Sequence, residues 1–492
     1  MNQENELAKA TVKGTLWIYA TFIFSKAMVF AANVILARLL LPDDFGLLAL
    51  GLLAINYIDT ITDLGVGAAV IYRQDNPERV ANVAFVISVA SGLLLSTLAF
   101  LGAPWVADFF DEPRLTAVMQ ALSVTILVAS LGGIHAARMK KELDFKRRFL
   151  PESARAIFKG GISIVLALMG WGVWSLVWGH IIGWAITTGL YWWVSGWRPR
   201  FSFDLNLARQ MVGYGIQMVL ISLFGQIIMN LDYVFIGRRM DAAQLGFYTI
   251  AFRIPELVIL NICTVVSQAI FPAFSKLQND PSRLRKGFLT TLRFVALITV
   301  PAAVGMTVVA PEFVNVFYTS RWSPAIPVMQ LLALYTLVYS LSFNAGDIYK
   351  ATGRPAILNQ IAIVRLLLTV PMLWYASNIS ILAVAAGVLA VNLVLTPLQL
   401  YIASRILKLS PIRILDSLRP AAVSTLAMTL VMLSLRMAVA PLDPLVRMIL
   451  LVLAGALSYG LALWLTNRPL LQQVIDLAMS LTGRRRPAVE GP

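Results

Sequence analysis

The chain alternates between long apolar runs and short polar connections. Each run holds about 20 mostly apolar residues, the length that an α-helix needs to cross the hydrocarbon core of a bilayer. The runs are continuous, whereas the strands of an outer-membrane barrel alternate apolar and polar positions. By this criterion the sequence predicts fourteen spans, at residues 15–39, 46–71, 81–103, 115–137, 151–170, 172–196, 210–237, 245–272, 288–310, 325–348, 357–377, 379–404, 418–439 and 445–466. We therefore expect an all-α, polytopic membrane protein with about 14 transmembrane helices.

The composition agrees with this prediction. Of the 492 residues, 59% are hydrophobic and only 13% are charged, whereas soluble domains have about 45–50% apolar and about 25% charged residues. This balance argues against a water-soluble enzyme and against a disordered chain, which needs low hydrophobicity.

The net charge of +15 is concentrated in the connections on one side of the predicted spans. With the N-terminus inside, far more Lys and Arg residues fall in cytoplasmic than in external segments, and six of them lie between residues 138 and 148. Because cytoplasmic loops of membrane proteins carry this excess, we expect both termini in the cytoplasm. The basic charge is then a topology signal, and nucleic acid is not an expected partner.

An internal repeat divides the chain. Residues 35–46 (ILARLLLPDDFG) resemble residues 235–246 (FIGRRMDAAQLG), so that Arg38 matches Arg238 and Gly46 matches Gly246. Six predicted helices separate the two copies, and an even number gives a parallel repeat about an axis along the membrane normal. The prediction is two pseudo-symmetric six-helix bundles (residues 1–209 and 210–410), two additional transmembrane helices (411–468) and a cytoplasmic tail (469–492).

Several ionisable residues lie inside the predicted spans, where charge is costly and marks a cavity or a pathway. Asp59 and Asp63 are four residues apart, on one face of a helix. They are candidates for binding a proton or a sodium ion, or for neutralising Lys26. Arg253 and Glu256 flank Pro255, and either form a local ion pair at a kink or face a central cavity. The full set of candidates is Lys26, Asp59, Asp63, Lys159, Asp232, Arg253, Glu256, Asp347 and Arg365.

The four cations of this set, Lys26, Lys159, Arg253 and Arg365, favour an anionic ligand such as a diphosphate head group, since Arg and Lys bind phosphate oxygens strongly in a low dielectric. Asp347 and Arg253 lie nearer span ends, where capping or snorkelling is the simpler interpretation. Seven of the twelve tryptophans lie between residues 171 and 197. They either stack on sugars or form interfacial belts, and the belts are favoured. Residues 179–183 (GHIIG) indicate close helix packing.

The sequence shows no cofactor or metal motif. Cys263 is the single cysteine, and the two histidines, His135 and His180, lie far apart without cysteine partners. There is no G-x-x-x-x-G-K-[ST] motif, which argues against ATP hydrolysis by a P-loop. No connection is long enough to form a folded domain, which disfavours a membrane polymerase or ligase with a large external loop.

Five segments resemble the polysaccharide flippases of the Wzx type. This is the colanic-acid-transporter-like branch of the multidrug/oligosaccharidyl-lipid/polysaccharide exporter superfamily. The segments are LARLLLPDDFG (36–46), DLGVGAAVI (63–71), KKELDF (140–145), YTIAFRIP (248–255) and FPAFSKLQND (271–280). The resemblance covers roughly residues 10–410, and its motifs are structural rather than catalytic.

The resemblance implies two six-helix bundles in a V shape plus two extra helices. It implies alternating access, with the chain flipping undecaprenyl-diphosphate-linked oligosaccharide repeat units across the bacterial inner membrane. The polymer would be an O-antigen, capsule or exopolysaccharide. Polymerase and export proteins are possible neighbours. In relatives, cations of the central cavity hold the diphosphate, and by position Lys26 and Arg253 match them best. The alternative is a proton- or sodium-coupled multidrug exporter of the same superfamily, with Asp59, Asp63, Asp232 and Glu256 as coupling residues.

Overall fold

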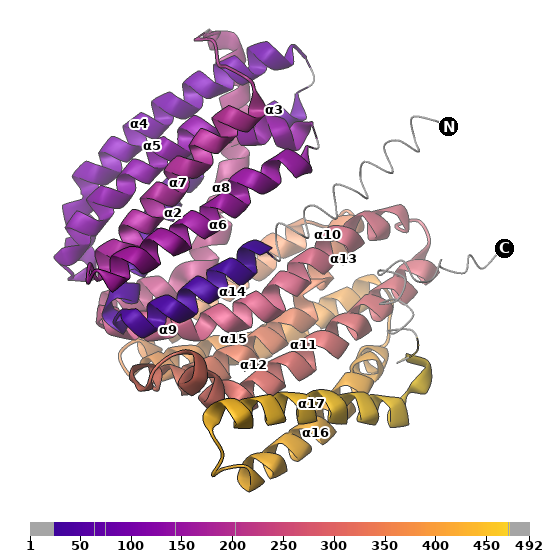
Figure 1. Cartoon of the computed structure of the whole chain (residues 1–492). Coiled ribbons are helices and arrows are strands. Elements are labelled where there is room, and N and C mark those ends of the chain that lie inside the picture. The colour runs from indigo at the N-terminus through magenta and orange to yellow at the C-terminus, as the bar shows by residue number, and fades with distance from the viewer. Residues whose placement is uncertain are drawn as a thin grey trace. The chain divides into compact units, whose positions relative to one another are not determined.

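The structure is a computed structural model that describes residues 24–470 apart from residues 63, 74, 143 and 202, and also residue 472. The described residues form helices and turns, and no strand occurs among them. By packing, the chain divides into two compact units, Met1–Thr249 and Ile250–Pro492. Figure 1 shows both as bundles of helices.

The first unit is built from long helices joined by short turns. It starts with a helix over residues 24–39. The strongest neighbours are consecutive antiparallel pairs, α4 with α5 and α6 with α7. The remaining helices are α2 (Pro42–Thr62), α3 (Val66–Tyr72), α4 (Pro77–Phe110), α5 (Arg114–Lys141), α6 (Phe145–Leu168), α7 (Val173–Ser195), α8 (Leu205–Arg239) and the start of α9 (Ala242–Pro255).

The second unit has the same construction, and its last two helices pack against each other and against α11. Figure 1 shows α16 and α17 in yellow as a neighbouring pair. The elements after α9 are η1 (Glu256–Leu260), α10 (Asn261–Lys276), α11 (Pro281–Phe317), η2 (Ser320–Trp322), α12 (Ala325–Phe343), α13 (Ala345–Ala351), α14 (Ala356–Ala376), α15 (Ile381–Ile406), α16 (Pro411–Ala438) and α17 (Pro444–Thr466).

Twelve stretches of helix in the described part of the chain are long and apolar enough to cross a membrane, two fewer than the fourteen predicted. The two differences have separate causes. The span predicted at 15–39 begins outside the described residues, although residues 24–39 are helical. The span predicted at 151–170 corresponds to α6, which is a helix as expected but carries too many charged residues to count as apolar.

Three predicted spans are interrupted. The span at 46–71 is two helices, α2 and α3, because Gly65 between them adopts a left-handed backbone with φ of 69°, a conformation that glycine accepts without steric cost. The span at 245–272 contains a π-helical turn, η1, directly after Pro255, because proline cannot donate the regular helical hydrogen bond. The span at 325–348 is divided at Asn344.

The packing boundary at Thr249 differs from the predicted boundary after residue 209. Helix α8 accounts for the difference, since it packs against α2, α3 and α4 of the first unit. A Cβ atom on Gly215 of α8 would lie 2.0 Å from the carbonyl oxygen of Leu64, so the two backbones touch. The division into two six-helix bundles follows from the internal repeat and stays a prediction.

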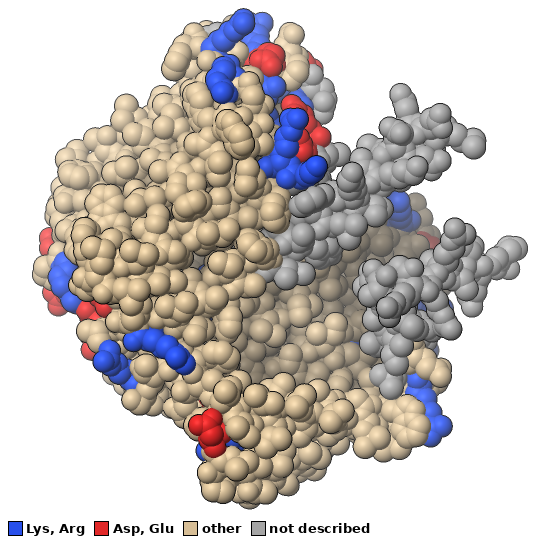
Figure 2. All heavy atoms as spheres, viewed as in Figure 1, with Lys and Arg blue, Asp and Glu red and all other residues tan. Residues whose placement is uncertain are grey.

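Aspartates start several helices. Asp204, Asp280 and Asp443 are N-caps of α8, α11 and α17, and each side chain accepts hydrogen bonds from backbone N–H groups of the first turn. The Leu207 N–H and the Arg79 guanidinium keep the pKa of Asp204 below its usual value. On the face shown in Figure 2, charged side chains lie in a few patches, and other residues form the surface between them.

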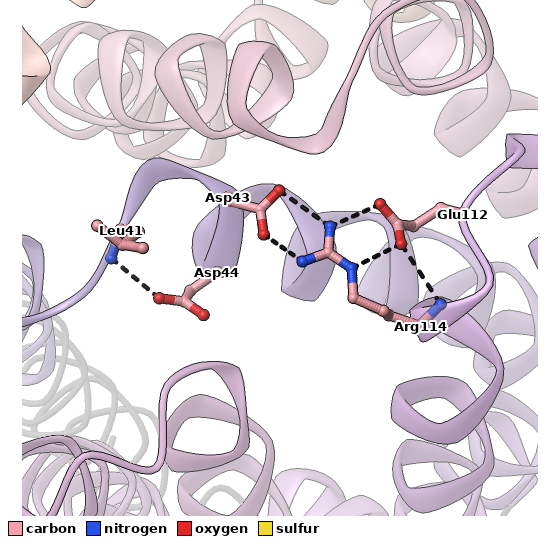
Figure 3. A network of polar contacts seen from close by, with 5 residues as sticks. All are labelled: Leu41, Asp43, Asp44, Glu112 and Arg114. Carbon is pink, nitrogen blue, oxygen red and sulfur yellow. Dashed lines mark hydrogen bonds and ion pairs between the residues drawn. The ribbon is translucent and has the colours of Figure 1, made fainter.

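A network of ion pairs holds the turn before α2 against the turn between α4 and α5. The guanidinium of Arg114 binds Asp43 through two nitrogens, at 2.6 and 3.1 Å, and binds Glu112 at 2.8 Å (Figure 3). Asp44 accepts the N–H of Leu41 at 2.9 Å. Two-point Arg–carboxylate pairs fix orientation as well as distance, so this network fixes the first turn of α2 against the turn between α4 and α5.

Candidate substrate cavity

A polar cavity of about 540 Å³ lies inside the first unit. Six helices supply its walls, and hydroxyl, amide and charged groups are mixed with one indole ring. This volume falls in the range of sites for small molecules. The polar groups that line it include Asp59 and Thr60 of α2, Ser88 of α4, Ser130 of α5, Glu152 and Arg155 of α6, Trp184, Thr187, Thr188 and Tyr191 of α7, and Ser222 and Gln226 of α8.

Helix α6 presents a polar stripe towards this region. Arg148, Glu152, Arg155 and Lys159 are spaced by four, three and four residues, the spacing that places side chains on one helix face. Arg148 Nη2 lies 2.5 Å from Glu152 Oε1, and the Tyr191 hydroxyl donates to the same oxygen at 3.3 Å. The charge of Glu152 is thus balanced within the wall.

Arg155 lies in a different environment. Its guanidinium carbon is 4.6 Å from the centre of the Trp184 ring, within the range of a cation–π interaction. In the part of the chain that the structure describes, Arg155 forms no hydrogen bond and no ion pair. Its N–H donors therefore remain available on the cavity wall.

Close contact between α6 and α7 brings these walls together. A Cβ atom on Gly179 would lie 2.7 Å from the Lys159 carbonyl oxygen, and one on Gly183 would lie 3.1 Å from the Lys159 Cβ. The G-x-x-x-G segment therefore packs tightly against the neighbouring helix, as its sequence predicts. Gly160 allows a similar close approach to the helix over residues 24–39. A Cβ atom added to Gly160 would lie 2.8 Å from the Cβ atom of Ala32.

Helices α2 and α8 form another part of the cavity wall. The Gln226 amide donates to the Thr60 hydroxyl. Asp59, which precedes Thr60 in the sequence, also lines the cavity. One turn further along α8, Asn230 leaves helical geometry. Asp232 follows this kink and accepts a hydrogen bond from the Tyr248 hydroxyl at 2.6 Å. Asp232 is not among the residues that line the cavity.

The other predicted site residues are spread over the chain. Lys159 lies on the α6 stripe, and Lys26 lies on the helix over residues 24–39. Asp63 lies outside the described residues, and α2 ends at Thr62 just before it. The predicted pairing of Asp59 and Asp63 on one helix face therefore stays a prediction.

Three predicted residues have local partners in the second unit. Arg253 Nη1 lies 3.4 Å from Glu256 Oε2, and both side chains are partly exposed. This is the ion pair around the Pro255 kink that the sequence suggested. Arg365 lies over the ring of Tyr339 at 5.2 Å. Tyr339 belongs to a column of aromatic rings along α12, with Tyr335 and Phe343 at 5.9 and 5.8 Å.

Asp347 is 2% exposed and binds Lys350 Nζ at 2.8 Å and the Ser267 hydroxyl at 2.6 Å. Its contacts hold α13 against α10, which agrees with the structural interpretation of this residue.

Comparison with known proteins identifies the family of this chain. Residues 35–327 match the model of a family described as polysaccharide biosynthesis protein. The chain belongs to this family.

Two curated relatives of this polysaccharide biosynthesis protein extend the match. The chain is 25% identical over 400 residues to the lipopolysaccharide biosynthesis protein WzxC of Escherichia coli (strain K12), covering 80% of the chain and 81% of the relative. It is 23% identical over 489 residues to the succinoglycan biosynthesis transport protein ExoT of Rhizobium meliloti (strain 1021), covering 98% of both. The resemblance predicted from the five segments is confirmed.

Solved structures with the same fold include two kinds of transporter. The lipid II flippase MurJ in an inward closed conformation has a TM-score of 0.75 at 14% identity, over 93% of this chain and 99% of that one. An inward-facing multidrug resistance transporter of the MATE family has a TM-score of 0.65 at 15% identity, over 78% and 94%. These similarities confirm the predicted all-α transporter fold.

Two charged residues of the cavity, Glu152 and Arg155, were not among the candidates from the sequence. Both fall inside the predicted span at 151–170, and their spacing from Lys159 indicates a common face. The tryptophans serve several purposes. Trp184 lines the cavity, whereas Trp192 and Trp197 pack against the ring of His135, each at 4.9 Å. Trp193 is 70% exposed, as expected for a belt residue.

Proposed function

We propose that this protein flips lipid-linked oligosaccharide repeat units across the bacterial inner membrane, for the synthesis of a surface polysaccharide. The lipid is a polyprenyl diphosphate, undecaprenyl diphosphate in most bacteria by the family resemblance. The observation that carries the proposal is the polar cavity lined by six helices of the first unit. Sugar hydroxyls need hydrogen-bond partners when they leave water, and this cavity offers hydroxyls, amides and carboxylates at membrane depth.

Family membership adds independent support. WzxC and ExoT are described by their roles in the biosynthesis of lipopolysaccharide and in the transport step of succinoglycan biosynthesis. The MurJ structure, described as a lipid II flippase, has the same fold. A transporter of this kind moves its substrate by rocking one bundle against another around a fixed site, and it needs no chemistry on the sugar.

The roles of individual residues are part of the proposal. Lys26, Lys159, Arg253 and Arg365 bind the anionic part of the substrate, because cations in a low dielectric bind phosphate oxygens strongly. Asp59, Asp63, Asp232 and Glu256 are the candidates for ion coupling. Of these, Asp59 is the one that lines the cavity. Both termini lie in the cytoplasm, as the distribution of Lys and Arg indicates.

The decisive experiment is deletion of the gene followed by mass spectrometry of extracted polyprenyl-linked glycans. We expect a complete repeat unit on its diphosphate lipid to accumulate while surface polymer is lost. Re-introduction of the wild-type gene is the control and restores both. Normal surface polymer with no accumulated intermediate contradicts the proposal.

A second candidate function is favoured by one observation, the fold shared with a multidrug resistance transporter. The same deletion strain tests it. A multidrug exporter predicts normal polymer and increased sensitivity to small toxic compounds, and the acidic Asp59 in the cavity is the feature that suits a cationic drug.

A further inference from the structure

The chemistry of the cavity indicates more than a neutral sugar, and the key residue is Arg155. A guanidinium inside a membrane-spanning bundle normally has an anionic partner, because an unpaired charge is costly there. Among the described residues Arg155 has none, and the Trp184 ring lies against its guanidinium, with the guanidinium carbon 4.6 Å from the ring centre. The nearest carboxylate on the same face, Glu152, is already held by Arg148 and Tyr191.

We propose that the cavity binds a sugar residue that carries a carboxylate, with Arg155 as its two-point partner and Trp184 as the surface that keeps the guanidinium in place. Arg presents parallel N–H donors that match a carboxylate, and stacking on an aromatic ring limits its rotation. This inference rests on the proposed function and names the substrate class: repeat units that contain a uronic acid or another carboxylated sugar.

The rest of the wall fits a sugar better than a lipid chain or a bare anion. The hydroxyls of Thr187 and Thr188 on α7, the amide of Gln226 on α8 and the carboxylate of Asp59 on α2 also line the cavity. Asp59 and Glu152 repel a free anion, but a carboxylate oxygen accepts hydrogen bonds from sugar hydroxyls. A ligand that carries an acidic group for Arg155 and hydroxyls for the carboxylates therefore satisfies both kinds of charged group in the lining.

Binding to the purified full-length chain tests the inference. The probes are cellobiouronic acid, which carries one carboxylate, cellobiose, which is its neutral counterpart, and inorganic pyrophosphate, ranked by saturation-transfer NMR. We expect the acidic disaccharide to bind the wild type about tenfold or more tightly than cellobiose, since a charged hydrogen-bond pair contributes that much. Arg155→Gln abolishes this preference, so that the acidic disaccharide binds the variant no more tightly than cellobiose does. Arg155→Lys retains part of it.

Arg468→Gln is the matched control. Arg468 also lies over an indole ring, that of Trp464 at 4.2 Å, but outside the cavity. The control variant keeps the preference for the acidic disaccharide. Equal binding of acidic and neutral probes by the wild type overturns the inference. Pyrophosphate competition that disappears in Arg155→Gln also overturns it, because Arg155 then serves the diphosphate.

A thermal melt of each variant shows whether it is folded. Trp184→Leu is a second variant, which weakens the preference for the acidic disaccharide without removing the charge.

The failure of this inference differs from failure of the proposed function. If only the inference fails, Arg155→Gln restores polymer to the deletion strain as fully as the wild type does. If the proposed function fails, the deletion strain accumulates no lipid-linked glycan whatever the state of Arg155.

Discussion

At the scale of single residues, Asp347 is the carboxylate with the clearest structural role. It is almost fully buried, and its oxygens bind the Lys350 ammonium and the Ser267 hydroxyl. Asp347→Ala leaves the Lys350 charge and the Ser267 hydroxyl without this partner. We expect a loss of about 2–3 kcal/mol of folding free energy, the contribution of a hydrogen bond to a charged group. Thermal and denaturant melts in detergent measure it.

Two variants calibrate this prediction. Asp347→Asn keeps an acceptor for Ser267 and loses only the attraction to Lys350, so it should cost less than Asp347→Ala. Asp416→Ala on α16 removes an exposed carboxylate and should change stability by no more than about 0.5 kcal/mol. If Asp347→Ala melts like Asp416→Ala, the buried contacts of Asp347 contribute nothing measurable to stability.

At the scale of helices, the two copies of the internal repeat touch each other within the first unit. A Cβ atom on Gly46 would lie 1.6 Å from the Ala242 carbonyl oxygen, and one on Gly246 would lie 1.9 Å from that of Pro42. These positions are equivalent in pairs, 200 residues apart. The contact is therefore reciprocal, which is the property of two segments related by a twofold axis.

Gly46→Ala and Gly246→Ala should each push α2 and α9 apart, because the neighbouring atoms are backbone and cannot rotate away. Overpacking of this kind costs about 1–3 kcal/mol, and we expect lower melting temperatures and reduced complementation of the deletion strain. Gly189→Ala is the matched control, since nothing lies within 4 Å of its added Cβ and alanine favours a helix interior. Wild-type melting of both test variants would show that the glycines are not in contact.

Helices were largely predictable from the sequence because membrane thickness sets the minimum length of a spanning apolar run. Their interruptions were less so. The break after α2 depends on Gly65, whose left-handed backbone is stabilised by contact with Gly215, far away in sequence. The cavity was predictable in part. Counting charges inside the predicted spans identified Asp59, which lines the cavity, but such a count does not say which way a side chain points. Glu152 and Arg155 follow from the spacing of polar residues on one face of α6. Trp184 is one of the seven clustered tryptophans, and it lines the cavity where α7 packs against α6.

At the scale of the whole molecule, the distribution of charge predicts which turns face the cytoplasm. The turn after α10 lies among Lys276, Arg283, Arg285 and Lys286, whereas residues 366–404 around the turn after α14 contain no Lys or Arg. The positive-inside rule then places Asn279 in the cytoplasm and Asn378 outside. Both side chains are exposed in the structure, so that each position is suitable for chemical labelling.

The chain has a single cysteine, Cys263, which is buried, so Cys263→Ala provides a background without reactive thiols. In that background, a membrane-impermeant maleimide applied to spheroplasts should label Asn378→Cys at once and Asn279→Cys only after lysis. Lysed samples of both variants are the control for reactivity. The opposite labelling pattern would mean that every span has the inverted orientation and that both termini lie outside. The basic connections would then lie outside as well, which would contradict the positive-inside rule. An inverted chain would also present the α6 stripe in the opposite direction across the membrane. The orientation therefore decides from which leaflet a lipid-linked substrate reaches Arg155.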